Sequence, residues 1–356
     1  MKLANLLLLI LFGPLVLAAT PEDMQSVNLR VAQEQVLPGY RHFHEKAERF
    51  RDTLGDFCSS PDEHGMSKAR EGFAQLLAAW MGAEHWQFGA IEFGLRRERI
   101  WFWPDKRGRS GRQLSAALAE ADPKLLAQDA FAYASVAVQG LTAAERLLYE
   151  NETLEAIASQ PYRCLLLKAI AGNMVHLSGE ILTDWQRAGD GDLAAIQGAE
   201  QDNDIYPEPA AVTARLLASL RNPLVRIHQL KLAAPMGESA TGARPKRAES
   251  WRSGLGIANL RSNFAALAAL YGEQPDQGLR SLLGERHAPL DREIVTAFEE
   301  IRKDLDKLPD DAFADPAQRP ALEALLARVQ SLEQTVEKSL PAALDIPLGF
   351  NSLDGD

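Results

Sequence analysis

The sequence predicts an all-α protein of two helical bundles, about four helices each, with a groove between them. Apolar residues recur at spacings of three and four nearly throughout, and alternating β-branched runs are scarce. The pattern divides near residue 160, giving an N-terminal bundle at 20–160, a C-terminal bundle at 161–345 and a tail at 346–356. One long irregular bundle is the alternative. The expected helices are 23–57, 66–88, 113–120, 124–150, 162–187, 209–232, 251–271, 291–307 and 316–340.

The N-terminus has the composition of a secretory signal peptide. Lys2 precedes an apolar stretch at 6–19, and the sequence turns polar at Thr20. The stretch is short for a membrane span, and small residues at its end place cleavage after Ala18 or Ala19; an uncleaved anchor is the alternative. We therefore expect residues 1–19 to be removed, leaving a periplasmic protein with no stable membrane span.

The charge balance argues against nucleic acid as a partner. The net charge is −11, and acidic and basic residues are interspersed without a long basic run. A phosphate backbone is bound by clustered Lys and Arg side chains, which this sequence does not offer.

The chain has two cysteines, Cys58 and Cys164. Disulfides persist in exported proteins, so these two residues are expected to form a structural bridge. The alternative is a pair of unrelated buried thiols, because cysteine is often buried without any bridge.

A carboxylate lies among apolar residues in the expected helix 124–150. Helical spacing places Thr142, Glu145 and Tyr149 on one stripe beside the apolar stripe that must face the core. A partly desolvated carboxylate needs a cation or a hydrogen-bond donor. Glu145 is therefore either a salt-bridged glutamate between helices or part of a ligand site.

The segment Gly140-Leu141-Thr142-Ala143-Ala144-Glu145 resembles the Gly-x-His-x-x-Glu motif of the imelysin family, with Thr142 at the histidine position. The run Phe102-Trp-Pro-Asp-Lys-Arg-Gly108 resembles a loop of a proteobacterial branch of that family, and 163–164 and 249–254 resemble further segments. The resemblance covers essentially the whole mature chain. It implies a periplasmic two-bundle protein linked to iron uptake, in a group classed as metallopeptidase-like, with Gly140 and Glu145 in a groove site.

Thr142 changes what the motif can do. A His and a Glu three residues apart on a helix can both reach one metal ion, whereas threonine offers only a weak neutral oxygen. This departure argues against peptidase activity. If a metal binds, iron and zinc are the candidates, and His85 and His176 are the residues that could join Glu145 as ligands.

Two further segments carry candidate site residues. The loop 89–112 contains Trp103, Asp105 and Arg107; such aromatic and charged side chains either cap a core or line a pocket. Ser250 and Ser253 precede the expected helix 251–271 and are N-cap candidates, while the resemblance places their segment opposite Glu145 in the groove.

The sequence thus predicts an exported, non-catalytic protein that binds a metal ion or small ligand in the groove around Glu145. An iron-uptake component of the cell envelope is a further candidate partner. A metallopeptidase with a degenerate motif and an envelope scaffold are the alternatives. The candidate ligand-binding residues are Gly140, Thr142, Glu145, Tyr149, Trp103, Asp105, Arg107, Ser250 and Ser253.

Overall fold

The computed structural model describes residues 19–150, 154–199 and 203–346. Within these ranges the chain forms helices and no strand, which confirms the all-α prediction. Residues 1–18 of the expected signal peptide and 347–356 of the expected tail lie outside the described residues.

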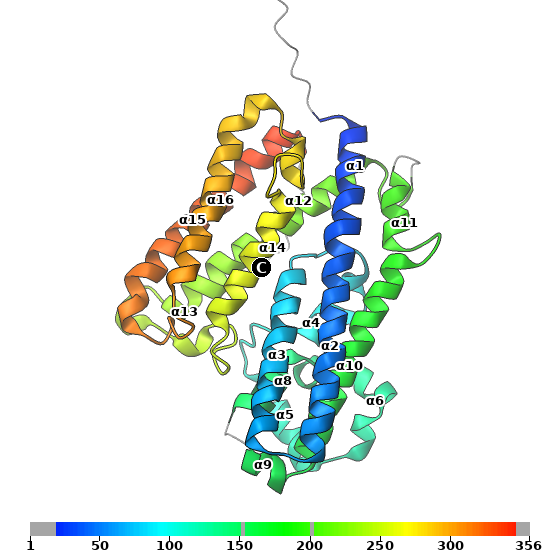
Figure 1. Cartoon of the computed structure of the whole chain (residues 1–356), viewed down its shortest axis with the longest axis vertical. Coiled ribbons are helices and arrows are strands. Elements are labelled where there is room, and N and C mark those ends of the chain that lie inside the picture. Colours follow the sequence, from blue (N-terminus) through cyan, green and yellow to red (C-terminus); the bar gives the residue numbers. More distant parts are fainter. Residues whose placement is uncertain (1–18, 151–153, 200–202, 347–356) are drawn as a thin grey trace, which may run out of the picture.

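The chain begins with one long helical rod. Helix α1 (Pro21–Val31) starts at a capping box on Thr20, passes through the π-helical segment η1 (Ala32–Val36) and continues as α2 (Leu37–Ser59). Proline disfavours the interior of a helix, because it lacks an N–H and its ring crowds the carbonyl four residues earlier, yet Pro38 lies within this rod. The wider π turn directly precedes Pro38, so the rod continues along both halves of the molecule (Figure 1).

The lower half of the molecule is a bundle built on α2, α3 (Glu63–Ala83) and α10 (Tyr162–Gln186). Its core holds aromatic pairs between α2 and α3, such as Phe43 with Trp80 at 5.3 Å between ring centroids. Short helices cover one end: α4 (Arg96–Ile100), α5 (Arg109–Glu120), α6 (Gln128–Ala132), α7 (Val136–Gln139), α8 (Leu141–Tyr149) and α9 (Leu154–Ser159).

Helix α10 lies in a different bundle from the one expected. The sequence analysis placed it at the start of the C-terminal bundle, but it packs along α2. It is long and apolar enough to cross a membrane by composition, yet half of its most apolar window is buried. Apolar side chains such as Leu167, Ile170 and Met174 are fully buried, so α10 is a core helix of the first bundle and the boundary near residue 160 does not separate the two packing units.

A disulfide joins Cys58, near the end of α2, to Cys164, near the start of α10. This confirms the bridge expected from the sequence. Because its two residues lie 106 positions apart, the bond fixes α10 against α2 at the far end of the lower bundle.

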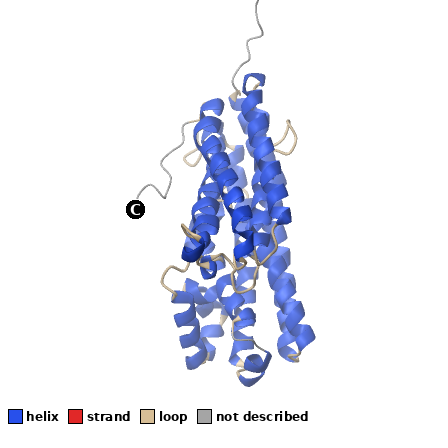
Figure 2. Cartoon of the chain, turned by 90° about the vertical axis from the view of Figure 1, so that its left-hand side faces the viewer, coloured by secondary structure: helices blue, strands red, loops and turns tan. Residues whose placement is uncertain are grey.

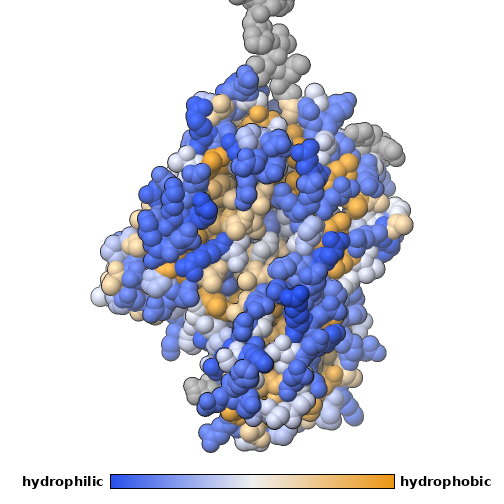
Figure 3. Space-filling view, in the orientation of Figure 1, coloured by the Kyte–Doolittle hydropathy of each residue, from blue (hydrophilic) through white to orange (hydrophobic). Residues whose placement is uncertain are grey.

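The upper half packs four long helices against one another, and one of them, α12 (Pro209–Arg226), packs against α1 (Figures 1 and 2). The others are α14 (Gly256–Tyr271), α15 (Ala288–Lys307) and α16 (Arg319–Leu344). The smaller elements include α11 (Asp192–Gln197), the π-helical η5 (Ile227–Ala233), α13 (Ala234–Met236) and several short 3-10 turns. Helix α14 also packs against α3, which joins the two bundles. Figure 3 shows a hollow with less polar side chains at this junction.

Candidate functional site

A cavity of about 530 Å³ surrounds Glu145 where the two bundles meet. One wall comes from α8 and the segment 101–108, and the other from η5, α13 and the segment 246–252. The volume lies within the range of small-molecule sites. Its lining residues are Trp101, Trp103, Pro104, Asp105, Lys106, Gly108, Thr142, Glu145, Arg146, Leu230, Ala234, Lys246, Arg247, Ala248, Ser250, Trp251 and Arg252.

Glu145 is the buried acid of this pocket, with only 2% of its surface exposed. Ser253 donates two hydrogen bonds to Oε1 of Glu145, from its backbone N–H at 3.1 Å and from its hydroxyl at 2.8 Å. Burial raises the pKa of Glu145, and the Ser253 hydrogen bonds and the Arg252 charge offset part of that rise. Oε2 accepts no hydrogen bond from the described residues.

Cations outnumber carboxylates in the pocket lining by five to two. The cations are Lys106, Arg146, Lys246, Arg247 and Arg252; the carboxylates are Asp105 and Glu145. Arg146 and Arg252 are deep, with side chains 14% and 13% exposed, and both pair with Glu150. Arg252 also lies 4.2 Å from the centroid of the Trp251 ring. On a chain of net charge −11, this pocket is a local positive site.

The loop residues divide between the pocket and the protein surface. Trp103 and Asp105 line the pocket as proposed, but Asp105 accepts hydrogen bonds from the backbone N–H groups of Arg109 and Ser110 at 2.8 and 2.9 Å. Although burial acts in the opposite direction, these bonds lower the pKa of Asp105. Arg107 is exposed and does not line the cavity. Asp105 therefore holds the start of α5, and Arg107 lies outside the pocket lining.

The expected helix 124–150 is broken, and its candidate residues separate accordingly. Gly140 precedes α8, and a Cβ there would lie 2.5 Å from the carbonyl oxygens of Arg99 and Ile100, so this glycine permits a close backbone crossing. Thr142 lines the pocket and donates to the Phe102 carbonyl at 3.3 Å.

Tyr149 lies outside the pocket. Its hydroxyl donates to the Arg70 carbonyl at 3.2 Å, and its ring packs on Phe73. It therefore contributes to the packing of α8 on α3 and not to the pocket lining.

Neither candidate serine is a helix N-cap. Helix α14 begins at Gly256 after Leu255 and has no side-chain cap. Ser250 is buried at the pocket wall with φ +52°, and its hydroxyl accepts from the Asn259 amide at 3.0 Å. Ser253 instead reaches across to Glu145, so the turn before α14 carries the groove contact that the resemblance implied.

The histidines considered as metal ligands do not line the pocket. His85 is 3% exposed and packs on Trp86, and burial lowers its pKa to about 3. The exposed His176 on α10 has Nε2 3.1 Å from Oε1 of Glu180. No group of three His, Cys, Asp or Glu side chains that could hold a metal occurs in 19–150, 154–199 or 203–346. The donor set around Glu145 therefore does not fit zinc or iron as a protein-bound metal centre.

A buried ionic cluster behind the pocket was not predicted. Lys231 of η5 is 2% exposed and pairs with Glu84, the residue after α3, and with Glu249. Oε2 of Glu249 lies 2.9 Å from Nζ of Lys231. Trp101, a pocket residue, donates its indole N–H to Oε1 of Glu249 at 3.1 Å. Burial raises the pKa of Glu249. Burial acts in the same direction on Glu84, but the Lys231 charge outweighs it there and the pKa of Glu84 is lowered. The resemblance at 249–254 was the one sequence signal for this cluster, which joins the two bundles.

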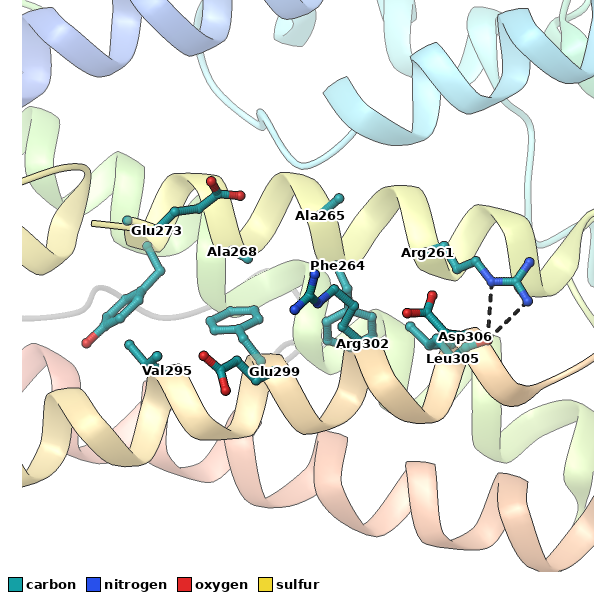
Figure 4. A pocket seen from close by; sticks show the side chains of 13 residues that line it. Arg261, Phe264, Ala265, Ala268, Glu273, Val295, Glu299, Arg302, Leu305 and Asp306 are labelled. Atoms are coloured by element: carbon teal, nitrogen blue, oxygen red, sulfur yellow. Dashed lines mark hydrogen bonds between the residues drawn. The ribbon is translucent and has the colours of Figure 1, made fainter. Parts of the chain in front are cut away.

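A second cavity, of about 570 Å³, lies between α14 and α15 (Figure 4). Phe264 and Phe298 contact each other in it, and charged side chains of both signs, including Glu299 and Arg302, stand around them. It contains none of the residues singled out from the sequence, and its mixed charges do not select one ligand class. The Glu145 pocket is therefore the candidate site.

Comparison with solved structures identifies the fold. An imelysin-like protein from Psychrobacter arcticum 273-4 superposes with a TM-score of 0.78 at 19% identity, covering 94% of this chain and 100% of that one. A protein from Parabacteroides distasonis ATCC 8503, named provisionally as an iron-regulated protein A precursor, gives a TM-score of 0.77 at 14% identity. That match covers 90% of this chain and 95% of the other.

Comparison by sequence identifies the family. A search of curated proteins finds no significant match. The imelysin family model, in contrast, matches residues 36–336, which include most of both bundles and every pocket residue. The chain therefore belongs to the imelysin family.

Proposed function

We propose that this protein is a non-catalytic binding protein that holds an anionic ligand in the Glu145 pocket. The observation that carries the proposal is the excess of cationic side chains in a cavity between two bundles. Two of those cations, Arg146 and Arg252, are largely buried, where electrostatic attraction to an anion is stronger than at the surface. The planar guanidinium group is also suited to bind carboxylates through paired hydrogen bonds.

The setting we propose is iron acquisition in the periplasm. Three observations support it: the signal-peptide composition of 1–19, the disulfide, which is typical of an oxidising compartment, and a structural relative whose name links it to iron regulation. The ligand in this setting is a carboxylate-bearing iron chelator or its iron complex. The loop motif 102–108 supports the proteobacterial branch of the family.

The same pocket argues against metal-dependent hydrolysis. Such a site needs several protein ligands and an open position on the metal. Here Thr142 occupies the motif position of the histidine and donates to the Phe102 carbonyl. Asp105 is already engaged by hydrogen bonds from the backbone at the start of α5. We therefore favour binding over peptidase activity.

Isothermal titration calorimetry on the mature protein tests the proposal. Citrate alone, citrate with ferric iron, ferrous sulfate and zinc chloride are titrated separately. We expect at least one citrate form to bind at micromolar concentration, more weakly as salt is added, and the bare metal ions to bind more weakly than citrate. Tight zinc or ferrous binding without any citrate binding would contradict the proposal.

Matched variants assign the binding to the pocket. Lys246→Gln/Arg247→Gln removes two exposed pocket cations and should weaken citrate binding by about tenfold, or roughly 1.4 kcal/mol. Lys303→Gln/Lys307→Gln removes the same charge on α15 at side chains 62% and 77% exposed. An equal loss of citrate affinity in the two double variants would mean that the overall charge of the protein, and not this pocket, attracts the ligand.

A further inference from the structure

We propose that the ligand of the Glu145 pocket is a hydroxycarboxylate, whose carboxylates pair with the pocket cations and whose hydroxyl donates to Oε2 of Glu145. This inference rests on the proposed function and narrows its ligand class. It follows from the position of one buried acid inside a cationic pocket.

The acid restricts which anions fit. Oε1 of Glu145 already accepts both Ser253 hydrogen bonds, whereas Oε2 has no donor among the residues described. Glu145 lines the pocket, so Oε2 is open to a ligand, and a ligand carboxylate placed against this carboxylate would be repelled. The ligand group that faces Oε2 must therefore be a hydrogen-bond donor.

The surroundings of Glu145 favour a neutral donor. Arg146 is the next residue on α8, and the Arg252 charge acts directly on the Glu145 carboxylate. A ligand ammonium beside these guanidinium groups would be repelled, whereas a hydroxyl carries no net charge. The same arginines can bind carboxylates, so one small molecule with both groups satisfies the pocket.

The pocket walls suit a compact carbon skeleton. Trp101, Trp103 and Trp251 supply aromatic surface in a cavity of about 530 Å³. Trp101 is held by its bond to Glu249 and Trp251 by Arg252, so these walls are formed before a ligand enters. Short hydroxylated di- and tricarboxylates combine a small apolar frame with the required charges.

The test compares pairs of acids that differ by one hydroxyl. Citrate is compared with tricarballylate, and malate with succinate, by calorimetry on the wild-type mature protein. Iron is left out, because ferric iron takes the hydroxyl oxygen as a ligand. A hydrogen bond to a charged acceptor predicts that each hydroxy acid binds at least about tenfold more tightly than its partner.

The variant Glu145→Gln tests whether the Glu145 carboxylate is the group that recognises the ligand hydroxyl. The amide removes the charged acceptor, so the preference for citrate over tricarballylate should fall to near unity. Glu45→Gln, at an exposed position of α2, makes the same charge change and should leave the preference intact.

The outcomes separate the two proposals. Equal binding of citrate and tricarballylate by the wild-type protein overturns the hydroxycarboxylate inference and leaves the anion-binding function standing. If neither acid of either pair binds, the hydroxycarboxylate inference fails, and the anion-binding function fails with it when citrate with ferric iron does not bind either. The wild-type comparison decides the inference even if Glu145→Gln does not fold.

Discussion

Ser253 binds Oε1 of Glu145 with both its backbone N–H and its hydroxyl, at 3.1 and 2.8 Å, although the two residues lie 108 positions apart. The contact joins α8 of the lower bundle to the turn before α14 of the upper bundle. It orients the buried carboxylate and leaves Oε2 without a donor among the residues that the structure describes, so the geometry of the pocket depends on how the bundles are joined.

Replacing Ser253 with alanine should destabilise the protein in a pH-dependent way. The serine hydroxyl lowers the Glu145 pKa against the effect of burial, and a hydrogen bond to a charged group contributes about 1.5–3 kcal/mol. Because the bond favours the ionised acid, the loss should be largest above the folded pKa of Glu145 and should shrink as the pH falls through it. Urea unfolding of Ser253→Ala at several pH values measures this. The control is Ser262→Ala, whose hydroxyl donates to the Ala258 carbonyl within α14 and to no carboxylate. A loss that grows towards low pH would refute the assignment.

Restoring the motif histidine should not restore a metal site. Thr142→His would place an imidazole one turn before Glu145, but the described pocket offers no third free donor and contains five cations. We expect the zinc affinity to rise by less than about tenfold, because two protein ligands bind weakly. Competition with a zinc-sensitive dye measures the gain. A larger gain in a folded variant would reveal a ligand set that the described geometry does not show.

Asp192 should destabilise the protein at neutral pH. It begins α11 and accepts the Ala90 N–H at 2.8 Å, and burial raises its pKa to about 6. Because the pKa of Asp192 is higher in the folded than in the unfolded protein, its contribution to folding stability is most favourable below the unfolded pKa, near 4. That contribution is lost as the pH rises through the folded pKa of about 6. Asp192→Asn should therefore gain stability relative to wild type as the pH is raised over that interval.

Urea unfolding of Asp192→Asn at about pH 4 and pH 7.5 gives the two free energies needed. Asp190→Asn, with a side chain 71% exposed in the neighbouring loop, is the control. If the difference between wild type and Asp192→Asn is the same at both pH values, the raised pKa is wrong.

Removing the buried Lys231 should cost far more than removing a surface cation. Lys231→Met leaves Glu84 and Glu249 buried without their counter-charge, and the free energy of unfolding should fall by about 3–5 kcal/mol. Arg328→Met breaks two ion pairs, with Glu300 and Asp304, at a side chain 42% exposed, and should cost at most about 1 kcal/mol. Chemical denaturation compares the two. Adding Glu249→Gln to Lys231→Met should recover part of the loss, and no recovery would contradict the charge argument.

The sequence by itself determined most of the long helices and the one covalent link, although it missed the breaks within 124–150. Helix α10 was expected at 162–187 and is found at Tyr162–Gln186, because the spacing of its apolar residues is a local property of the chain. Only one intramolecular pairing of Cys58 and Cys164 was possible. The sequence also singled out Glu145, because a carboxylate among apolar residues is visible without any knowledge of its neighbours.

Only the tertiary structure decided which helix faces meet, and with them the site. Apolar periodicity shows that a face is buried but not against which partner, so α10 was assigned to the wrong bundle. The same limit concealed the pairing of Glu145 with Ser253 and of Lys231 with Glu84 and Glu249. Arg107 and Arg252 look alike as sequence letters, yet one points into solvent and the other lines the pocket. Their difference arises from backbone direction and long-range packing, which the order of residues does not display locally.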